Sequence, residues 1–116
     1  MTTLLSVNAA VEQLTTLMGT DVQIRGILSF GFEDVAIYHH PKAERRDDYK
    51  SSIWLEVGWG SLIFDEAVCR RLDGKLVDVQ GTLFGPDPNF GGCGHMSLWP
   101  ALLLARDLER ARHYSC

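Results

Sequence analysis

Residues Val22-Gln23-Ile24-Arg25-Gly26-Ile27-Leu28 and Val77-Asp78-Val79-Gln80-Gly81-Thr82-Leu83 follow one pattern, V-x-[IV]-x-G-x-L. Alternating apolar and polar residues are typical of a strand with one buried face. A glycine inside a strand marks a bulge or a tight bend, because the missing Cβ lets the sheet coil. The repeat predicts two curved, neighbouring strands with Gly26 and Gly81 at their bends, although two glycine-bearing strands can also match by chance.

The segment before the first of these strands predicts an amphipathic helix at residues 7–18. Ser6 can cap its start, and Gly19 is a natural terminator because glycine adopts a left-handed conformation at no cost. The apolar residues have the spacing of one buried helical face. They are Val7, Ala10, Val11, Leu14, Leu17 and Met18. This face is expected to pack on the domain's own core, with a partner-binding helix as the alternative.

The remaining patterns predict the order helix, three strands, helix, two strands. The expected strands span residues 21–30, 35–40, 53–57, 75–84 and 95–104, and the second helix spans 65–72. Five strands of which two bend sharply can close into a barrel, with the second helix plugging one end. Pro100 lacks the N–H that a strand neighbour needs, so it indicates an edge or a bulge. The charged residues 105–113 are expected to be a strand end or a terminal helical turn.

This arrangement resembles the OB-fold, a five-stranded Greek-key barrel of oligonucleotide- and oligosaccharide-binding proteins. The resemblance covers residues 20–108. It rests on 22–28, on 53–57 followed by the helix 65–72, and on 74–83, which looks like the fourth strand of many OB-type domains. The leading helix resembles the one before the barrel in small bacterial OB-type proteins. Residues 94–99 resemble a stretch of other small bacterial proteins, a likeness that implies no function.

We therefore expect a single α+β domain, mainly β: a five-stranded OB-like barrel with an N-terminal amphipathic helix and a short helix between strands 3 and 4. Within residues 1–116 the helix is expected at 6–19, the barrel at 20–108 and a C-terminal tail at 109–116. An open, strongly bent antiparallel sheet packed by the N-terminal helix is the alternative.

Composition narrows the class of protein. Eleven Lys and Arg stand against fifteen Asp and Glu, a net charge of −4 that disfavours nucleic acid as a partner. No apolar run approaches the roughly 18–20 residues of a membrane span, so no membrane partner is expected. The first residues show no export signal, and we expect a cytoplasmic protein.

Cys69, Cys93 and Cys116 are expected to be free thiols. A Cys93–Cys116 link, or an intermolecular bridge through Cys116, remains the alternative.

The resemblance to OB-type domains implies a set of groove residues, because aromatic side chains on the second and third strands and nearby loops of such barrels stack bases or anchor partners. The candidate binding residues are Tyr38, His39, Arg46, Trp54, Trp59, Phe90 and His95. The alternative is that Tyr38 and Trp54 belong to the core. Arg46 is suited to phosphate, but the acidic pair at residues 47–48 weakens its field.

The sequence favours neither catalysis nor a cofactor. It has no G-x-S-x-G, no H-E-x-x-H and no glycine loop leading into a helix. Cys93 and His95 form a poorly preorganised pair, and a closed zinc site needs about four ligands. His39 and His40 are adjacent on an expected strand, so their side chains should point to opposite faces. We therefore expect no catalytic residue, no metal site and no cofactor.

The function favoured by the sequence is a small, non-enzymatic binding module that acts through protein–protein contact, for instance as an inhibitor or immunity-type partner. Its first 41 residues carry one basic and four acidic groups, a balance that attracts a basic protein and repels phosphate. The alternative is a single-stranded nucleic-acid-binding OB-type protein that uses aromatic stacking. A scaffold without a discrete ligand is a third hypothesis.

Overall fold

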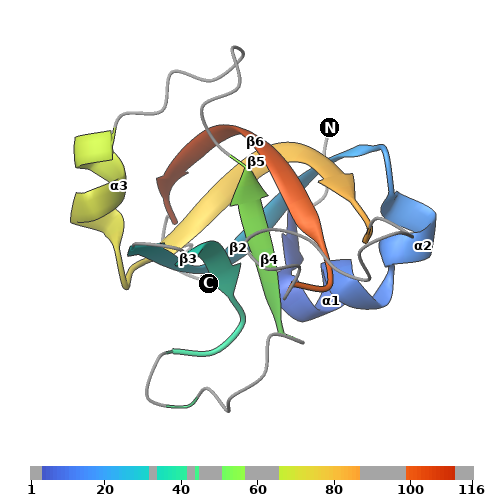
Figure 1. The fold of residues 1–116 in the computed structure, drawn as a ribbon, viewed down its shortest axis with the longest axis horizontal. Coiled ribbons are helices and arrows are strands. Elements are labelled where there is room, and N and C mark those ends of the chain that lie inside the picture. The colour runs from blue at the N-terminus through green and yellow to red at the C-terminus, as the bar shows by residue number, and fades with distance from the viewer. Residues whose placement is uncertain are drawn as a thin grey trace, which may run out of the picture.

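The structure is a computed structural model, and it describes residues 4–31, 34–41, 44, 51–56, 66–86 and 99–111. In this part of the chain the fold is mainly β, with short helices at the ends of the sheet (Figure 1). The elements are β1 (Leu4–Ser6), α1 (Val7–Glu12), α2 (Leu14–Leu17), β2 (Asp21–Gly31), β3 (Asp34–Tyr38), β4 (Ser52–Glu56), α3 (Glu66–Leu72), β5 (Leu76–Phe84) and β6 (Leu102–Arg110). The expected order of helix, three strands, helix and two strands is confirmed, with β1 as an addition.

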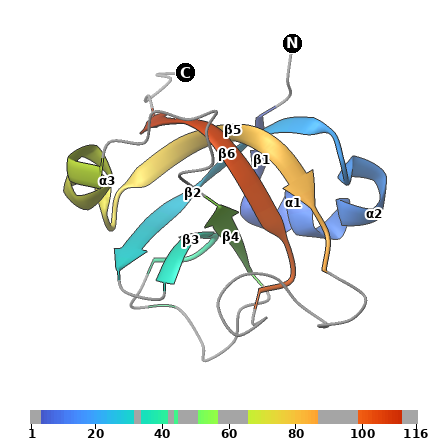
Figure 2. The same ribbon diagram turned by 45° about the horizontal axis from the view of Figure 1, so that its top comes forward.

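The described strands form one six-stranded sheet in the order β1-β2-β3-β4-β6-β5. A further pairing of β2 with β5 joins five of these strands into a ring (Figure 2). Neighbours in the ring are antiparallel except β4 and β6, which are parallel. α3 lies at one end of the ring, and α1 and α2 lie at the other (Figures 1 and 2).

The main core lies inside this ring because every second residue of each strand faces inward. Val22, Ile24 and Leu28 of β2 are buried there, as their alternation predicts. Both ends of the ring are covered by helices. α1 contributes Val7 and Ala10, and α3 contributes the buried thiol of Cys69 together with the half-buried Leu72.

Gly81 lies at a bulge, as expected. The register of β5 with β6 shifts between Gln80 and Gly81 and skips Arg106. Gly26 differs: it pairs in regular register with Val77 of β5, with no shift at this point. Its small size is needed for packing, because a Cβ there would lie 2.7 Å from Cγ2 of Val7 and 3.1 Å from Cβ of Ile37.

The N-terminal helix is interrupted, so the expectation of one helix over residues 7–18 is wrong. Ser6 caps α1 as expected, with its hydroxyl accepting from the Ala9 amide at 3.1 Å. The helix breaks at Gln13, and α2 ends before Gly19, which has the expected left-handed φ of 78°. Thr15 and Thr16 weaken the second turn because β-branched side chains lose rotamer freedom in a helix. Met18 is exposed rather than part of the buried face.

Three strand boundaries also differ from expectation. β6 spans Leu102–Arg110 instead of 95–104, and residues 95–98 lie outside the described part of the chain. The bulge that skips Arg106 interrupts the alternation of inward and outward side chains, so the sequence pattern alone predicts that the strand ends before the charged second half of β6. β6 therefore extends two residues beyond the expected barrel boundary at 108. β3 ends at Tyr38, before both histidines, and β1 was not expected.

Candidate binding site

Two of the predicted groove residues, Tyr38 and Trp54, lie on the outer face of the ring. Along β3, Ile37 faces the main core, whereas Ala36 and Tyr38 belong to a second hydrophobic cluster with Trp99. Trp54 of the neighbouring strand β4 packs against this cluster, with its ring centroid 4.7 Å from that of Trp99. The two predicted aromatics are thus brought together, and a third aromatic that was not predicted joins them.

This aromatic cluster is packed rather than open. Tyr38 is 7% exposed and Trp99 is 2% exposed. Trp54 is half-buried, and its indole N–H donates to Oε2 of Glu56 at 3.1 Å. A base cannot stack on a ring that is already covered, and the carboxylate of Glu56 adds negative charge beside the half-buried ring. The cluster therefore suits structural packing better than nucleic-acid stacking.

His39 follows β3 and connects three parts of the chain. Its Nδ1 accepts a hydrogen bond from the backbone N–H of Asn8 in α1 at 3.3 Å. Its own backbone N–H donates to the carbonyl of Ser51, next to β4, at 2.9 Å. Burial, and secondarily the charge of His40, lowers the pKa of His39 below its ordinary value of 6.5.

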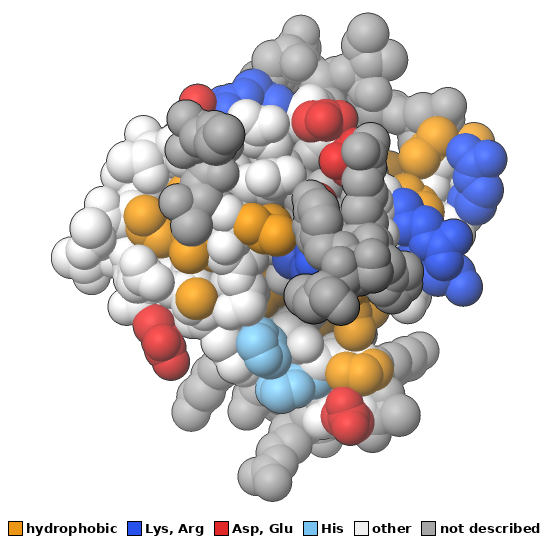
Figure 3. All heavy atoms as spheres, turned by 180° about the vertical axis from the view of Figure 1, so that it is seen from behind, with side chains coloured by type: hydrophobic (Ala, Val, Ile, Leu, Met, Phe, Trp, Pro, Cys, Tyr) orange, Lys and Arg blue, Asp and Glu red, His pale blue; other side chains and the backbone are white. Residues whose placement is uncertain are grey.

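The expectation that His39 and His40 point to opposite faces of a strand is wrong. Both residues lie in a bend after β3, where side chains no longer alternate. Their rings meet edge to face, with centroids 4.7 Å apart and an interplanar angle of 74°. The described histidine side chains lie together on the face shown in Figure 3, with hydrophobic side chains near them.

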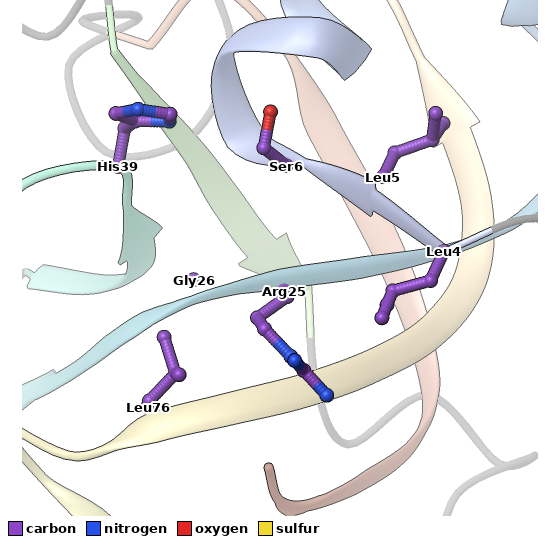
Figure 4. Close-up of a pocket in the computed structure, with 7 residues that line it drawn as sticks. All are labelled: Leu4, Leu5, Ser6, Arg25, Gly26, His39 and Leu76. Atoms are coloured by element: carbon purple, nitrogen blue, oxygen red, sulfur yellow. The ribbon is translucent and has the colours of Figure 1, made fainter. Parts of the chain in front are cut away.

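A hollow, here called the basin, lies beside His39 where β1 and β3 end against β2 (Figure 4). It has a volume of about 330 Å³. The residues lining it are Leu4, Leu5, Ser6, Arg25, Gly26, His39 and Leu76. β1 and β3 share one edge of β2: Ser6 pairs with Arg25, and Tyr38 pairs with Ile27. The basin forms at the junction between them, beside the backbone of Gly26.

The basin is mostly apolar and close to neutral. Leu4 from β1 and Leu76 from β5 are exposed hydrophobic side chains on either side of Arg25 (Figure 4). The guanidinium of Arg25 is paired with the carboxylate of Asp78, with Nε donating to Oδ1 at 2.7 Å and Nη2 donating to Oδ2 at 3.0 Å. Asp78 is itself buried. Because a bidentate pair holds the guanidinium in place and compensates its charge, the basin presents an apolar surface with a fixed polar floor.

Of the three predicted binding residues that the structure describes, Tyr38, His39 and Trp54, only His39 lines the basin. Arg46, Trp59, Phe90 and His95 lie outside the residues that the structure describes. Sequence reasoning missed the other lining residues, notably Leu4, Arg25 and Leu76. A signal for Arg25 was present in the repeated pattern, because its position in the first copy faces outward, whereas Leu4 and Leu76 lie outside the pattern.

Comparison with known proteins finds no matching family model and no similar curated protein. A proposal for the function of this chain therefore rests on its geometry. In the described ranges, no helix is long and apolar enough to cross a membrane. Those same ranges bring no three His, Cys, Asp or Glu side chains together in the way a metal ion requires.

Proposed function

We propose that this chain is a non-enzymatic, OB-like binding module of the cytoplasm that acts through contact with another protein. The OB-like interpretation is supported by a ring of five strands, counted from β2, with a helix between its third and fourth strands. The parallel pairing of β4 with β6 and the closing pair β2–β5 are consistent with a Greek-key path. Fold alone does not specify a ligand, so the site has to carry the functional argument.

The observation that carries the proposal is the basin with its two exposed leucines. Hollows of roughly 300–1,000 Å³ with apolar walls and a few fixed polar groups are the usual form of a binding site. Protein interfaces gain most of their affinity where an apolar side chain of the partner enters such a hollow and water is excluded. Leu4 and Leu76 are placed to cover the entering side chain from both sides. The partner therefore offers an apolar anchor residue.

The nucleic-acid alternative is less well supported by the same geometry. Tyr38 is covered, and the half-buried ring of Trp54 packs against Trp99 and donates its indole N–H to a carboxylate, so neither ring is a good platform for a base. The net charge of −4 opposes phosphate binding. This alternative is tested together with the proposal.

Two strand residues of equal exposure provide a matched test. Leu76 lines the basin and is 42% exposed, whereas Phe84, at the other end of the same strand, is 41% exposed and does not line it. The tagged full chain, Leu76→Asp and Phe84→Asp are used to capture proteins from native cell extract, and circular dichroism verifies that each variant is folded. A protein recovered by the wild type and by Phe84→Asp is expected to bind Leu76→Asp at least tenfold more weakly, the usual loss at an anchor position.

Equal recovery by Leu76→Asp and the wild type would contradict the proposal. Titration of the wild type with fluorescently labelled single-stranded oligonucleotides at low and moderate salt provides the second arm. Saturable binding that weakens with salt and is lost in Trp54→Ala would favour the nucleic-acid alternative instead.

A further inference from the structure

His39 joins two elements that are far apart in the sequence, and it does so at the rim of the basin. The Asn8 amide that it binds belongs to the first turn of α1, and β1 leads directly into that helix. Leu5 and Ser6 at the end of β1 line the basin together with His39. The hydrogen bond from Asn8 to His39 therefore connects the two sides of the hollow.

This hydrogen bond requires a neutral imidazole. A ring nitrogen accepts a hydrogen bond only while it carries no proton, so Nδ1 must be unprotonated when the Asn8 amide donates to it. Protonation would place an N–H opposite the Asn8 N–H and replace an attraction with a repulsion. Burial and the neighbouring His40 act in the same direction, since both lower the pKa of His39.

The charged groups around His39 in the described part of the chain lie on its own segment, on β2, on β5 and on α1. On its own segment the neighbour is His40, and on β2 it is Arg25, which lines the same basin. Asp78 of β5 pairs with the guanidinium of Arg25. α1 carries Glu12 at the end opposite to Asn8. The charge of Arg25 is compensated by that pair, so His40 is the neighbour that, together with burial, disfavours protonation of His39.

We propose that the basin is gated by pH: protonation of His39 breaks its hydrogen bond with the Asn8 amide, frees the start of α1 from the end of β3 and weakens partner binding. The effect on binding rests on the proposed function, whereas the structural step does not. When folding lowers the pKa of a histidine, the neutral side chain contributes fully to stability at pH values above the ordinary pKa of 6.5. That contribution is lost as the pH falls through the lowered pKa, so the closed basin belongs to neutral pH and the loosened one to acidic pH.

The structural step is tested on the full-length chain by NMR between pH 7.5 and 5. The resonances of the His39 ring are expected to titrate with a midpoint below 6.5. The Asn8 amide is expected to lose about fivefold in protection from hydrogen exchange over the same range, after correction for the intrinsic rate. This factor corresponds to one hydrogen bond of ordinary net strength.

Two variants separate gating from general acid destabilisation. In His39→Asn the side-chain oxygen can take the place of Nδ1 as acceptor but cannot titrate, so the protection of Asn8 should no longer depend on pH. In His40→Asn the ring of His39 still titrates, with a midpoint that moves up toward 6.5 because the like charge is gone. An Asn8 amide that stays protected at pH 5 in the wild type, or that loses protection equally in His39→Asn, would overturn the proposal.

Binding of the captured partner at pH 7.5 and 5.5 completes the experiment. The wild type should lose at least fivefold in affinity at the lower pH, whereas His39→Asn should lose less than twofold. If Asn8 responds to pH but the wild type and His39→Asn lose affinity equally, the gate does not control binding and the proposal fails. A partner that binds Leu76→Asp normally contradicts the proposed function instead, and leaves the NMR result as the measure of the structural step.

Discussion

Replacing Gly81 by alanine should destabilise the fold, because the fourth strand of the ring passes the fifth without space for a side-chain carbon. A Cβ at this position would overlap the carbonyl oxygen of Leu104 and lie 2.8 Å from its carbonyl carbon and 3.0 Å from Cα of Ala105. All three atoms belong to the backbone of β6, so no side chain can rotate away. β6 would have to move away from β5 at the bulge.

The expected loss follows from what this movement breaks. Overpacking in a close-fitting interior costs about 1–3 kcal/mol. One or two weakened ladder hydrogen bonds add about 0.5–1.5 kcal/mol each. Together these give a decrease of about 1.5–6 kcal/mol in the free energy of unfolding for Gly81→Ala. With about 4–8 °C per kcal/mol for a domain of this order of size, the melting temperature should fall by at least about 6 °C.

Two other glycines serve as controls in the same urea and thermal unfolding series. In Gly31→Ala the new Cβ meets nothing within 4 Å, so this variant should be neutral or more stable by up to about 1 kcal/mol. In Gly26→Ala the nearest atom is Cγ2 of the Val7 side chain at 2.7 Å, which can move, so the loss should lie between the two, at about 1–2 kcal/mol. If Gly81→Ala unfolds with the same midpoint as Gly31→Ala, the explanation by close backbone approach is refuted.

Three further predictions concern the outer face of the ring. Asp78→Ala should cost about 1–2 kcal/mol in urea unfolding because it leaves the half-buried Arg25 without its carboxylate, and a double-mutant cycle with Arg25→Ala should show coupling; strictly additive effects would contradict this. Arg106→Ala should raise the pKa of Asp21 toward 3.8 in a carboxyl NMR titration, since the hydrogen bond from Arg106 is the main cause of its lowering, and an unchanged pKa would disprove that cause. Because the pKa of Asp21 is lowered, the stability that its carboxylate contributes is present above about pH 3.8 and is lost as the pH falls from there through the lowered pKa. Trp54→Phe should change the near-ultraviolet circular dichroism because the ring centroids of Trp54 and Trp99 lie 4.7 Å apart, and an unaltered spectrum would argue against this packing.

Local features of the fold were predictable where neighbouring residues determine them. The alternation in residues 22–28 predicted which side chains of β2 enter the core, and Ser6 and Gly19 marked the ends of the N-terminal helical region. The binding site was far less predictable. His39 was identified as a candidate, but its role depends on the amide of Asn8, 31 residues away, which no local pattern specifies.

The amino-acid sequence by itself determined the element order, the inward faces of the strands and the need for small residues at 26 and 81, because period, capping and steric size are properties of short segments. Only the tertiary structure decided that β1 joins the sheet, since a three-residue strand exists through its pairing with Gln23, Ile24 and Arg25 and not through its own propensity. It also decided that Leu4 and Leu76 flank one hollow. These residues come from β1 and β5, which pair with opposite edges of β2, and their proximity is a consequence of register.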